Sequence, residues 1–189
     1  PRNSNEPGCN MAIYSPELIT RAKKAAAAAA VGFIQDGMNV GLGTGSTATY
    51  FIDALIERCK QGLKVQAVAT SEKSHFQAEQ GGIPMLDVET ITTLDMTVDG
   101  ADEIDREKRM IKGGGGALLR EKIIASISKE MIVIVDESKM VPLLGGFPLP
   151  VEIARFAYGA TINTLNEKGY FGRLRMAAEA PYTTDSGHY

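Results

Sequence analysis

One stretch of this sequence, from Val98 to Ala125, reads VDGADEIDREKRMIKGGGGALLREKIIA. It contains an acidic turn, then Lys112, the glycines Gly113–Gly116 and a helix pattern that carries Glu121. Glycines at a helix start let a ligand approach backbone N–H groups at the positive end of the helix dipole. Carboxylates opposite an ammonium group suit proton transfer beside a developing negative charge. The stretch therefore predicts an enzyme active site.

The segments around this stretch alternate between strand and helix patterns. A helix is expected to begin at Ser15-Pro16, with Ser15 as its N-cap, and to stop at Gly37. Further helices are expected over residues 48–60, from after the Thr70-Ser71 turn to Gln80, and over residues 118–128. Short strands are expected over residues 38–43, 65–69, 83–86, 96–98 and 131–135. Repeated strand–helix units predict an α/β fold with a doubly wound, mainly parallel, Rossmann-like sheet.

Ligands of such sheets bind beyond the carboxyl ends of the strands. Three polar motifs fall at these ends, namely Gly43–Thr47, Thr70-Ser71 and Asp99–Asp102. Their convergence at one edge of the sheet predicts a common binding site.

The sequence divides into three parts. Residues 1–10 are polar and are expected to be a tag remnant or loose tail, and residues 11–146 form the α/β catalytic domain. Residues 147–189 follow a Pro/Gly-rich linker and predict a small α+β domain with a helix over 156–168. About 40 residues are too few to close a core alone. The final TTDSGHY is typical of a turn between two strands, the second of which is absent.

Composition excludes several classes of protein. The chain has 189 residues and a net charge of −3, without the basic excess of a nucleic-acid-binding protein. No apolar run reaches the roughly 18 residues of a membrane span, and no signal-peptide pattern is present, so a cytoplasmic protein is expected. Cys9 and Cys59 lack metal-ligand or redox spacing, and no metal site is predicted.

The loop that follows the first strand is a candidate phosphate site. It reads Gly41-Leu-Gly-Thr-Gly-Ser-Thr47, which lacks the Gly-Lys-Ser/Thr of a P-loop and the third glycine of the dinucleotide fingerprint. Backbone N–H groups and the hydroxyls of Thr44, Ser46 and Thr47 at a helix start suit one phosphate monoester. The alternative is a tight turn with Ser/Thr capping.

The acidic turn and the glycine run have alternatives of their own. Asp99-Gly-Ala-Asp102 could be only a turn, but Glu103 and Asp105 add more carboxylates than a turn needs. Lys112 could be a solvated surface lysine. Each glycine destabilises the folded chain by roughly 0.5–1 kcal/mol through its loss of backbone entropy. A run of four beside a helix start therefore indicates a function beyond that of a linker.

Glu121 is the candidate general base. It shares its helix face with Ala117, Ile124 and Ala125, and apolar surroundings raise the pKa of a carboxyl group. The alternative is an exposed glutamate paired with a neighbouring Lys or Arg. Lys139 follows the strand over 131–135, at the same sheet edge, and is a weak candidate for binding an anionic substrate.

Together these segments resemble the A type of ribose-5-phosphate isomerase, from Leu18 to about Glu152. The matching segments are GLGTGSTATYFIDAL, the Thr70-Ser71 turn, VDGADEID, MIKGGGGALLREKIIA, VDESK and FPLPVE. The resemblance implies a doubly wound domain with a small α+β domain. It also implies interconversion of D-ribose 5-phosphate and D-ribulose 5-phosphate in the pentose phosphate pathway, by a homo-oligomer (dimer or tetramer) without metal or organic cofactor.

The resemblance also assigns roles to individual residues. Glu121 matches the catalytic base, with Asp99 and Lys112 as further catalytic residues, and the reaction passes through a cis-enediolate. The matching substrate-binding residues are Thr44, Gly45, Ser46 and Thr47 for the phosphate, the acidic turn Asp99, Gly100, Ala101 and Asp102, the loop Lys112, Gly113, Gly114 and Gly115, and Lys139.

Two other functions stay open at this point. A non-catalytic sugar-phosphate-binding regulatory domain of related fold would keep the phosphate loop but would not need Lys112 or Glu121. A coenzyme A transferase-like relative would form a thioester on its glutamate. The family pattern also continues past TDSGHY into a strand–helix–strand portion that this sequence lacks, so the small domain is expected to be incomplete.

Overall fold

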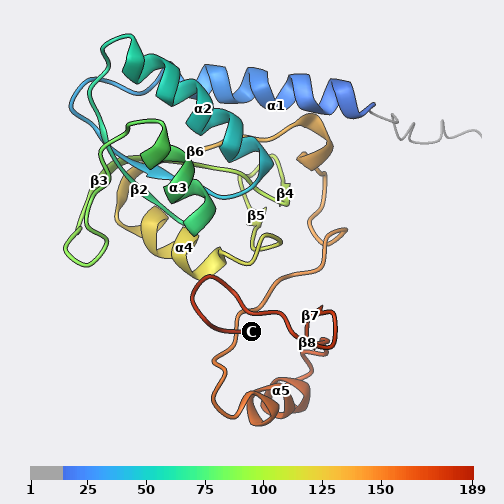
Figure 1. The fold of residues 1–189 in the computed structure, drawn as a ribbon. Coiled ribbons are helices and arrows are strands. Elements are labelled where there is room, and N and C mark those ends of the chain that lie inside the picture. The colour runs from blue at the N-terminus through green and yellow to red at the C-terminus, as the bar shows by residue number, and fades with distance from the viewer. Residues whose placement is uncertain (1–14) are drawn as a thin grey trace, which may run out of the picture.

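A computed structural model of the chain describes residues 15–189 (Figure 1). The expected tail of residues 1–10 and Cys9 lie outside the described residues. Helix α1 begins where the sequence predicts, because the Ser15 side chain accepts a hydrogen bond from the Leu18 N–H at 3.2 Å and Pro16 occupies the first turn.

Four parallel strands form the central sheet, in the order β2-β1-β3-β6. These strands are β1 (Asn39–Leu42), β2 (Gln66–Ala69), β3 (Leu94–Asp99) and β6 (Ser128–Val133). The chain passes from β1 to β2 on one side and then crosses back to place β3 on the other side of β1. This reversal makes the β1/β3 boundary the switch point at which doubly wound sheets bind ligands. The α/β prediction is confirmed.

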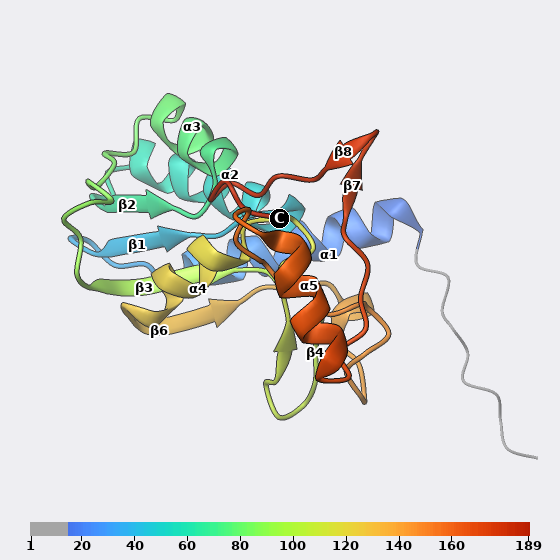
Figure 2. The same ribbon diagram turned by 90° about the horizontal axis from the view of Figure 1, so that it is seen from below.

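Helices cover both faces of this sheet (Figures 1 and 2). Apolar side chains of α1 and α2 pack on one face with Val40 and Leu42, and α4 packs on the other face, where Ile124 meets Val68 and Leu94. Helix α3 lies beside the edge strand β2. The helices are α1 (Pro16–Val31), α2 (Ser46–Lys60), α3 (Glu72–Gln80) and α4 (Leu118–Ser126).

Several element boundaries differ from the sequence prediction; strand β6, for example, spans Ser128–Val133 instead of 131–135. Helix α1 stops at Val31 instead of Gly37, so Phe33 lies outside the helix with 60% of its surface exposed, whereas Ile34 is buried. Residues 83–86 form only an isolated bridge between Met85 and Ala67. Helix α4 ends at Ser126, because the next residues already belong to β6.

A hairpin interrupts the path between β3 and α4. Strands β4 (Glu103–Ile104) and β5 (Met110–Ile111) pair antiparallel, and β5 ends directly before Lys112. The hairpin therefore returns the chain to the end of β3, so that Lys112 and Asp99 meet although thirteen residues separate them. After β6, the short 3-10 turn η1 (Glu137–Lys139) leads into the linker.

The segment 147–189 forms a separate lobe beneath the sheet domain (Figure 1). It contains α5 (Tyr158–Glu167) and the two-stranded β7 (Met176–Ala177) and β8 (Ala180–Pro181). None of its side chains is buried, and Phe156 is 92% exposed. Near the chain end, Tyr189 exchanges two backbone hydrogen bonds with Ile153.

Candidate active site

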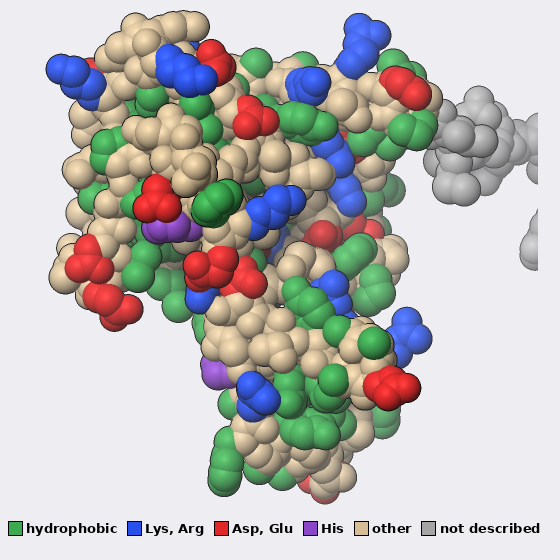
Figure 3. Space-filling view, in the orientation of Figure 1, with side chains coloured by type: hydrophobic (Ala, Val, Ile, Leu, Met, Phe, Trp, Pro, Cys, Tyr) green, Lys and Arg blue, Asp and Glu red, His purple; other side chains and the backbone are tan. Residues whose placement is uncertain are grey.

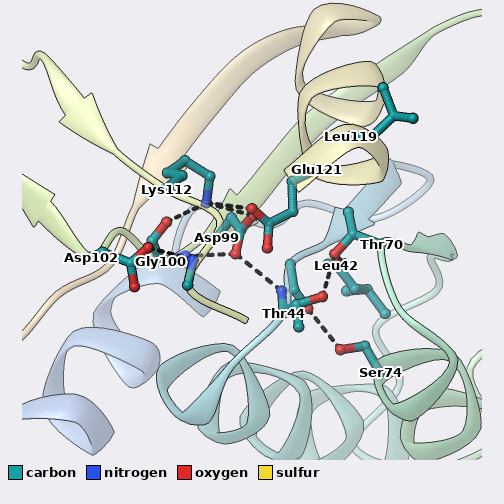
Figure 4. A network of polar contacts seen from close by, with 12 residues as sticks. Leu42, Thr44, Thr70, Ser74, Asp99, Gly100, Asp102, Lys112, Leu119 and Glu121 are labelled. Carbon is teal, nitrogen blue, oxygen red and sulfur yellow. Dashed lines mark hydrogen bonds and ion pairs between the residues drawn. The ribbon is translucent and has the colours of Figure 1, made fainter. Parts of the chain in front are cut away.

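Asp99 is the hub of the polar network at the switch point (Figure 4). It ends β3, is 1% exposed, and accepts hydrogen bonds at Oδ1 from the N–H groups of Thr44 (3.1 Å) and Gly100 (2.7 Å). Its Oδ2 accepts one from Lys112 Nζ at 2.9 Å. A side chain at position 43 would overlap Asp99, so Gly43 lets the phosphate loop lie directly against it. A buried carboxylate with three donors is well satisfied.

Lys112 joins the two carboxylates of the site. Its Nζ lies 2.9 Å from Asp99 Oδ2 and 3.3 Å from Glu121 Oε2, and it donates to the Gly100 carbonyl at 2.5 Å. Burial alone would lower the pKa of Lys112, but the carboxylates of Asp99 and Glu121 outweigh it and hold that pKa above its usual value. Lys112 is therefore a fixed cation inside the site and not a solvated surface lysine.

Glu121 lies in α4 and is only 5% exposed. Burial, followed by the negative charge of Asp99, raises the pKa of Glu121 to about 7, although Lys112 acts in the opposite direction. Despite the ion-pair distance to Lys112, Oε2 is the one buried side-chain oxygen or nitrogen of residues 15–189 without a hydrogen-bond partner. An unpartnered carboxylate oxygen with a pKa near neutrality can accept a proton from a ligand.

Asp102 connects the acidic turn to the glycine loop. Its Oδ2 accepts a hydrogen bond from the Gly114 N–H at 2.8 Å. A side chain at Gly114 would crowd both Asp102 and Phe147, and Gly113 has a φ of +105°, which favours glycine. The turn Asp99–Asp102 and the loop Gly113–Gly115 are thus held face to face.

The other two carboxylates of the acidic stretch have structural partners. Glu103 accepts hydrogen bonds from the N–H groups of Gly145 (2.8 Å) and Phe147 (2.6 Å) and so fixes the linker. Asp105 closes the hairpin turn, where Arg109 Nε donates to it at 2.7 Å. The surplus of acidic residues in the sequence therefore has two causes, a polar site and the anchoring of the backbone around it.

The loop Thr44–Thr47 lies at the start of α2, with Gly45 as its N-cap at a φ of +107°. Lys23, on α1, donates to Ser46 Oγ at 2.9 Å and lies 4.0 Å from Asp136. The Thr44 hydroxyl contacts the buried Thr70 hydroxyl at 2.7 Å. The loop thus presents a helix N-terminus, hydroxyl groups and an ammonium group, a combination that suits a phosphate.

Lys23 was not found from the sequence, because only the packing of α1 over α2 brings it to the loop. Lys139 stays a prediction. Its side chain is partly exposed and makes no hydrogen bond or ion pair within residues 15–189, and only its backbone N–H bonds to the Asp136 carbonyl.

Residues 15–189 show no other kind of site. No three of their His, Cys, Asp or Glu side chains are grouped to hold a metal ion, and none of their helices is long and apolar enough to cross a membrane. A hollow of about 440 Å³ lies at the amino end of β2, between Cys59, Lys64 and Pro84, but no carboxylate lines it. The chemistry is therefore concentrated at the carboxyl ends of β1 and β3.

Known proteins are similar to this chain in both sequence and fold. The family model for ribose 5-phosphate isomerase A (phosphoriboisomerase A) matches residues 66–189. A ribose-5-phosphate isomerase A from Protochlamydia amoebophila is 57% identical over 176 residues, which cover 93% of this chain and 75% of that protein. The isomerase from Bacillus mycoides is 49% identical over 166 residues, covering 88% and 75% respectively.

Solved structures agree with these relatives. Ribose 5 phosphate isomerase A from Neisseria gonorrhoeae superimposes with a TM-score of 0.82 at 42% identity, over 90% of this chain and 74% of that one. A D-ribose-5-phosphate isomerase in complex with phospho-erythronic acid gives a TM-score of 0.84 at 39% identity, over 90% and 76%. The chain belongs to the ribose-5-phosphate isomerase A family.

Proposed function

We propose that this chain interconverts D-ribose 5-phosphate and D-ribulose 5-phosphate through a cis-enediolate, in the non-oxidative pentose phosphate pathway. One observation carries the mechanism: Glu121 is buried, has a pKa of about 7 and keeps one oxygen free of hydrogen bonds beside Lys112. Near neutral pH, a base with this pKa is unprotonated in a large share of molecules and is still basic enough to accept a proton from the substrate.

The phosphate end of the sugar binds at Thr44, Gly45, Ser46 and Thr47. Support for this assignment comes from the position of the loop at the α2 N-terminus and from the ammonium group of Lys23 at Ser46. Asp99 ties this loop to the catalytic cluster through the Thr44 N–H. Anchoring one end of the substrate holds its reacting carbons near Glu121, which lowers the entropic part of the barrier.

Ring opening requires an acceptor for the hydroxyl proton at the anomeric carbon. Asp99 and Asp102 are the candidates from the acidic turn. Both oxygens of Asp99 already accept hydrogen bonds, whereas Asp102 uses only Oδ2 and is partly exposed. We therefore assign the proton transfer to Asp102: it accepts the C1 hydroxyl proton as the bond between C1 and the ring oxygen breaks, and it returns the proton to that oxygen, while Asp99 holds Lys112 and the loop in position.

Glu121 then removes the proton from C2 of the open aldose. The electron pair of that C–H bond forms the C1–C2 double bond, and the carbonyl oxygen takes up the negative charge. Lys112 and N–H groups of the glycine loop stabilise this oxygen, a type of contribution typically worth a few kcal/mol. Return of the proton from Glu121 to C1, with transfer of the C2 hydroxyl proton to the oxygen on C1, gives the ketose.

The reaction proposed here needs no metal ion, because Lys112 supplies the positive charge beside the developing oxyanion. The test is formation of ribulose 5-phosphate from ribose 5-phosphate in EDTA. Full activity is expected, and activity that disappears with chelator and returns with a divalent cation would contradict this reading.

Glu121→Gln tests the function itself. We expect turnover to fall at least 1,000-fold while the Kd for inorganic phosphate stays within twofold, since the phosphate loop is untouched. Near-full turnover by this variant would remove Glu121 from the mechanism. Phosphate binding without turnover by the unmodified chain would favour the regulatory alternative, and a thioester at Glu121 would favour the transferase.

We also propose that the chain forms a homo-oligomer, a dimer or tetramer, in the cytoplasm. Hydrophobic side chains gather on the visible face of the lobe formed by residues 147–189 (Figure 3). The exposed large hydrophobic residues of this lobe include Phe156, Phe171 and Met176. Exposed apolar patches of this kind commonly mark protein interfaces. Light scattering tests the oligomer, with a monomeric mass as the contrary result, and cell fractionation tests the location.

A further inference from the structure

Three consecutive carbonyls of the glycine loop accept hydrogen bonds from the C-terminal lobe. Arg175 Nη1 donates to the Gly114 carbonyl at 2.9 Å, and the Tyr182 hydroxyl donates to the Gly115 carbonyl at 3.2 Å. The Asp185 N–H donates to the Gly116 carbonyl at 3.3 Å. The lobe has no buried core, yet it contacts the substrate-facing loop at every one of these peptide groups.

Further contacts hold the Arg175 and Tyr182 side chains and the Asp185 backbone in place. The Arg175 guanidinium lies 4.0 Å from the centre of the Tyr182 ring, so the two donors brace each other. Arg120, next to Glu121 in the sequence, donates to the Asp185 carbonyl at 2.6 Å. A side chain at Gly116 would overlap the Tyr182 ring, and its φ of +81° also favours glycine.

The lobe also holds the start of the helix that carries Glu121. Glu152 Oε2 accepts a hydrogen bond from the Leu119 N–H at 3.3 Å, and its Oε1 accepts one from the Thr184 hydroxyl at 2.7 Å. A carboxylate at an unsatisfied N–H of the first helical turn is a stabilising cap. Glycine loop and catalytic helix are therefore fixed by the same lobe.

The direction of the loop carbonyls sets the direction of its N–H groups. In a trans peptide the C=O and the following N–H point in opposite directions. The Gly114 and Gly116 N–H groups are committed to Asp102 and the Gly113 carbonyl, whereas the Gly115 N–H has no acceptor within residues 15–189. Because Arg175 draws the Gly114 carbonyl toward the lobe, the Gly115 N–H points away from the lobe. Gly115 also faces the phosphate loop, since a Cβ at this position would lie 3.7 Å from Thr44 Cγ2.

We propose that Arg175 and Tyr182 are positioning residues, which hold the Gly114–Gly115 peptide so that the Gly115 N–H donates to the oxyanion of the enediolate. This inference rests on the proposed isomerase function and deepens it. Without the two side chains the peptide is free to rotate, and the oxyanion keeps Lys112 but loses a preorganised N–H donor. The loss is therefore partial and falls on the intermediate, not on the phosphate end of the substrate.

The test compares Arg175→Met and Tyr182→Phe with the matched controls Arg173→Met and Tyr170→Phe, made in the whole chain. Tyr182→Phe removes a single oxygen and keeps the ring against Gly116. Neither control side chain makes a hydrogen bond or ion pair within residues 15–189. The measurements are kcat, KM, the thermal midpoint, and inhibition constants for phospho-erythronic acid and inorganic phosphate. The acid carries a carboxylate that places negative charge near the position of the enediolate oxygens, and inorganic phosphate reports on the phosphate loop alone.

We expect each of the two variants to lower kcat about tenfold and to weaken phospho-erythronic acid about tenfold, below the 10²–10³ for complete loss of an oxyanion donor. KM, the inhibition constant for inorganic phosphate and the thermal midpoint should match those of the controls. Unchanged kcat and unchanged acid binding in Tyr182→Phe would overturn the proposal, as would an equal loss of phosphate affinity. An inactive unmodified chain would instead count against the proposed function, and acid binding still decides the positioning role.

Discussion

The polar site at the sheet edge buries charged groups, whereas the C-terminal lobe exposes apolar ones. At the carboxyl ends of β1 and β3, Asp99, Lys112 and Glu121 are charged groups held inside the protein, while in segment 147–189 the aromatic side chains of Phe156 and Phe171 lie in solvent. Burial makes each charge of the first region depend on its neighbours. The second region affects the site through hydrogen bonds to the glycine loop and to the first turn of α4. Substitutions should therefore have large electrostatic effects in the first region and small ones in the second.

Lys112→Met should have the largest effect of the predictions that test this contrast. It removes the cation between Asp99 and Glu121 and the stabilisation of the oxyanion, so kcat should fall about 10²–10³-fold. Because Lys112 lowers the pKa of Glu121, the acidic limb of the residual activity should also move to higher pH. A steady-state pH profile measures kcat and the position of the acidic limb. If neither changed in the variant, Lys112 would have only a structural role.

Glu121→Gln should stabilise the protein at alkaline pH although it lowers turnover at least 1,000-fold. The pKa of Glu121 is raised from 4.5 to about 7 on folding, so the native state binds the proton more tightly than the unfolded state. The stability of the unmodified protein should therefore fall as the pH rises from about 4.5 to 7, and Gln removes this loss. Urea unfolding at pH 8 should show a gain on the order of 2 kcal/mol, which disappears at pH 4. If the variant and the unmodified protein had equal free energies of unfolding at pH 8 and at pH 4, folding would not raise the pKa of Glu121.

Phe171→Ser should have the smallest effect. Phe171 is 83% exposed, and exposed substitutions away from special features usually change the free energy of unfolding by less than about 0.5 kcal/mol. Thermal unfolding at a concentration that keeps the chain monomeric measures this. A loss above 2 kcal/mol under these monomeric conditions would contradict the exposed position of Phe171.

The sequence was informative where function lies on contiguous segments. The loop after β1, the turn after β3 and the glycine run before α4 are each local patterns, and the parallel-sheet rule places them at one edge. The pattern was not sufficient where a contact depends on packing between distant elements. Lys23 reaches Ser46 only across the α1/α2 interface, and Arg175 reaches Gly114 from a lobe whose sequence gives no functional signal.

Misread boundaries have a similar cause. Phe33 fits the helical period of α1, but the chain turns at Gly32 and buries Ile34 instead. Glu103 and Asp105 give the sequence more carboxylates than a turn needs, and charge alone does not distinguish a carboxylate that meets a ligand from one that accepts backbone N–H groups. Such distinctions need the partner atoms, which the sequence does not contain.

The pH dependence of kcat/KM of the unmodified chain tests the central claim most directly. The account predicts that kcat/KM for ribose 5-phosphate rises with pH along a single acidic limb centred near pH 7, as Glu121 loses its proton. The limb should be absent from the residual activity of Glu121→Gln. A limb centred near pH 4.5 would mean that Glu121 ionises as an ordinary exposed glutamate, and the buried-base mechanism would be wrong.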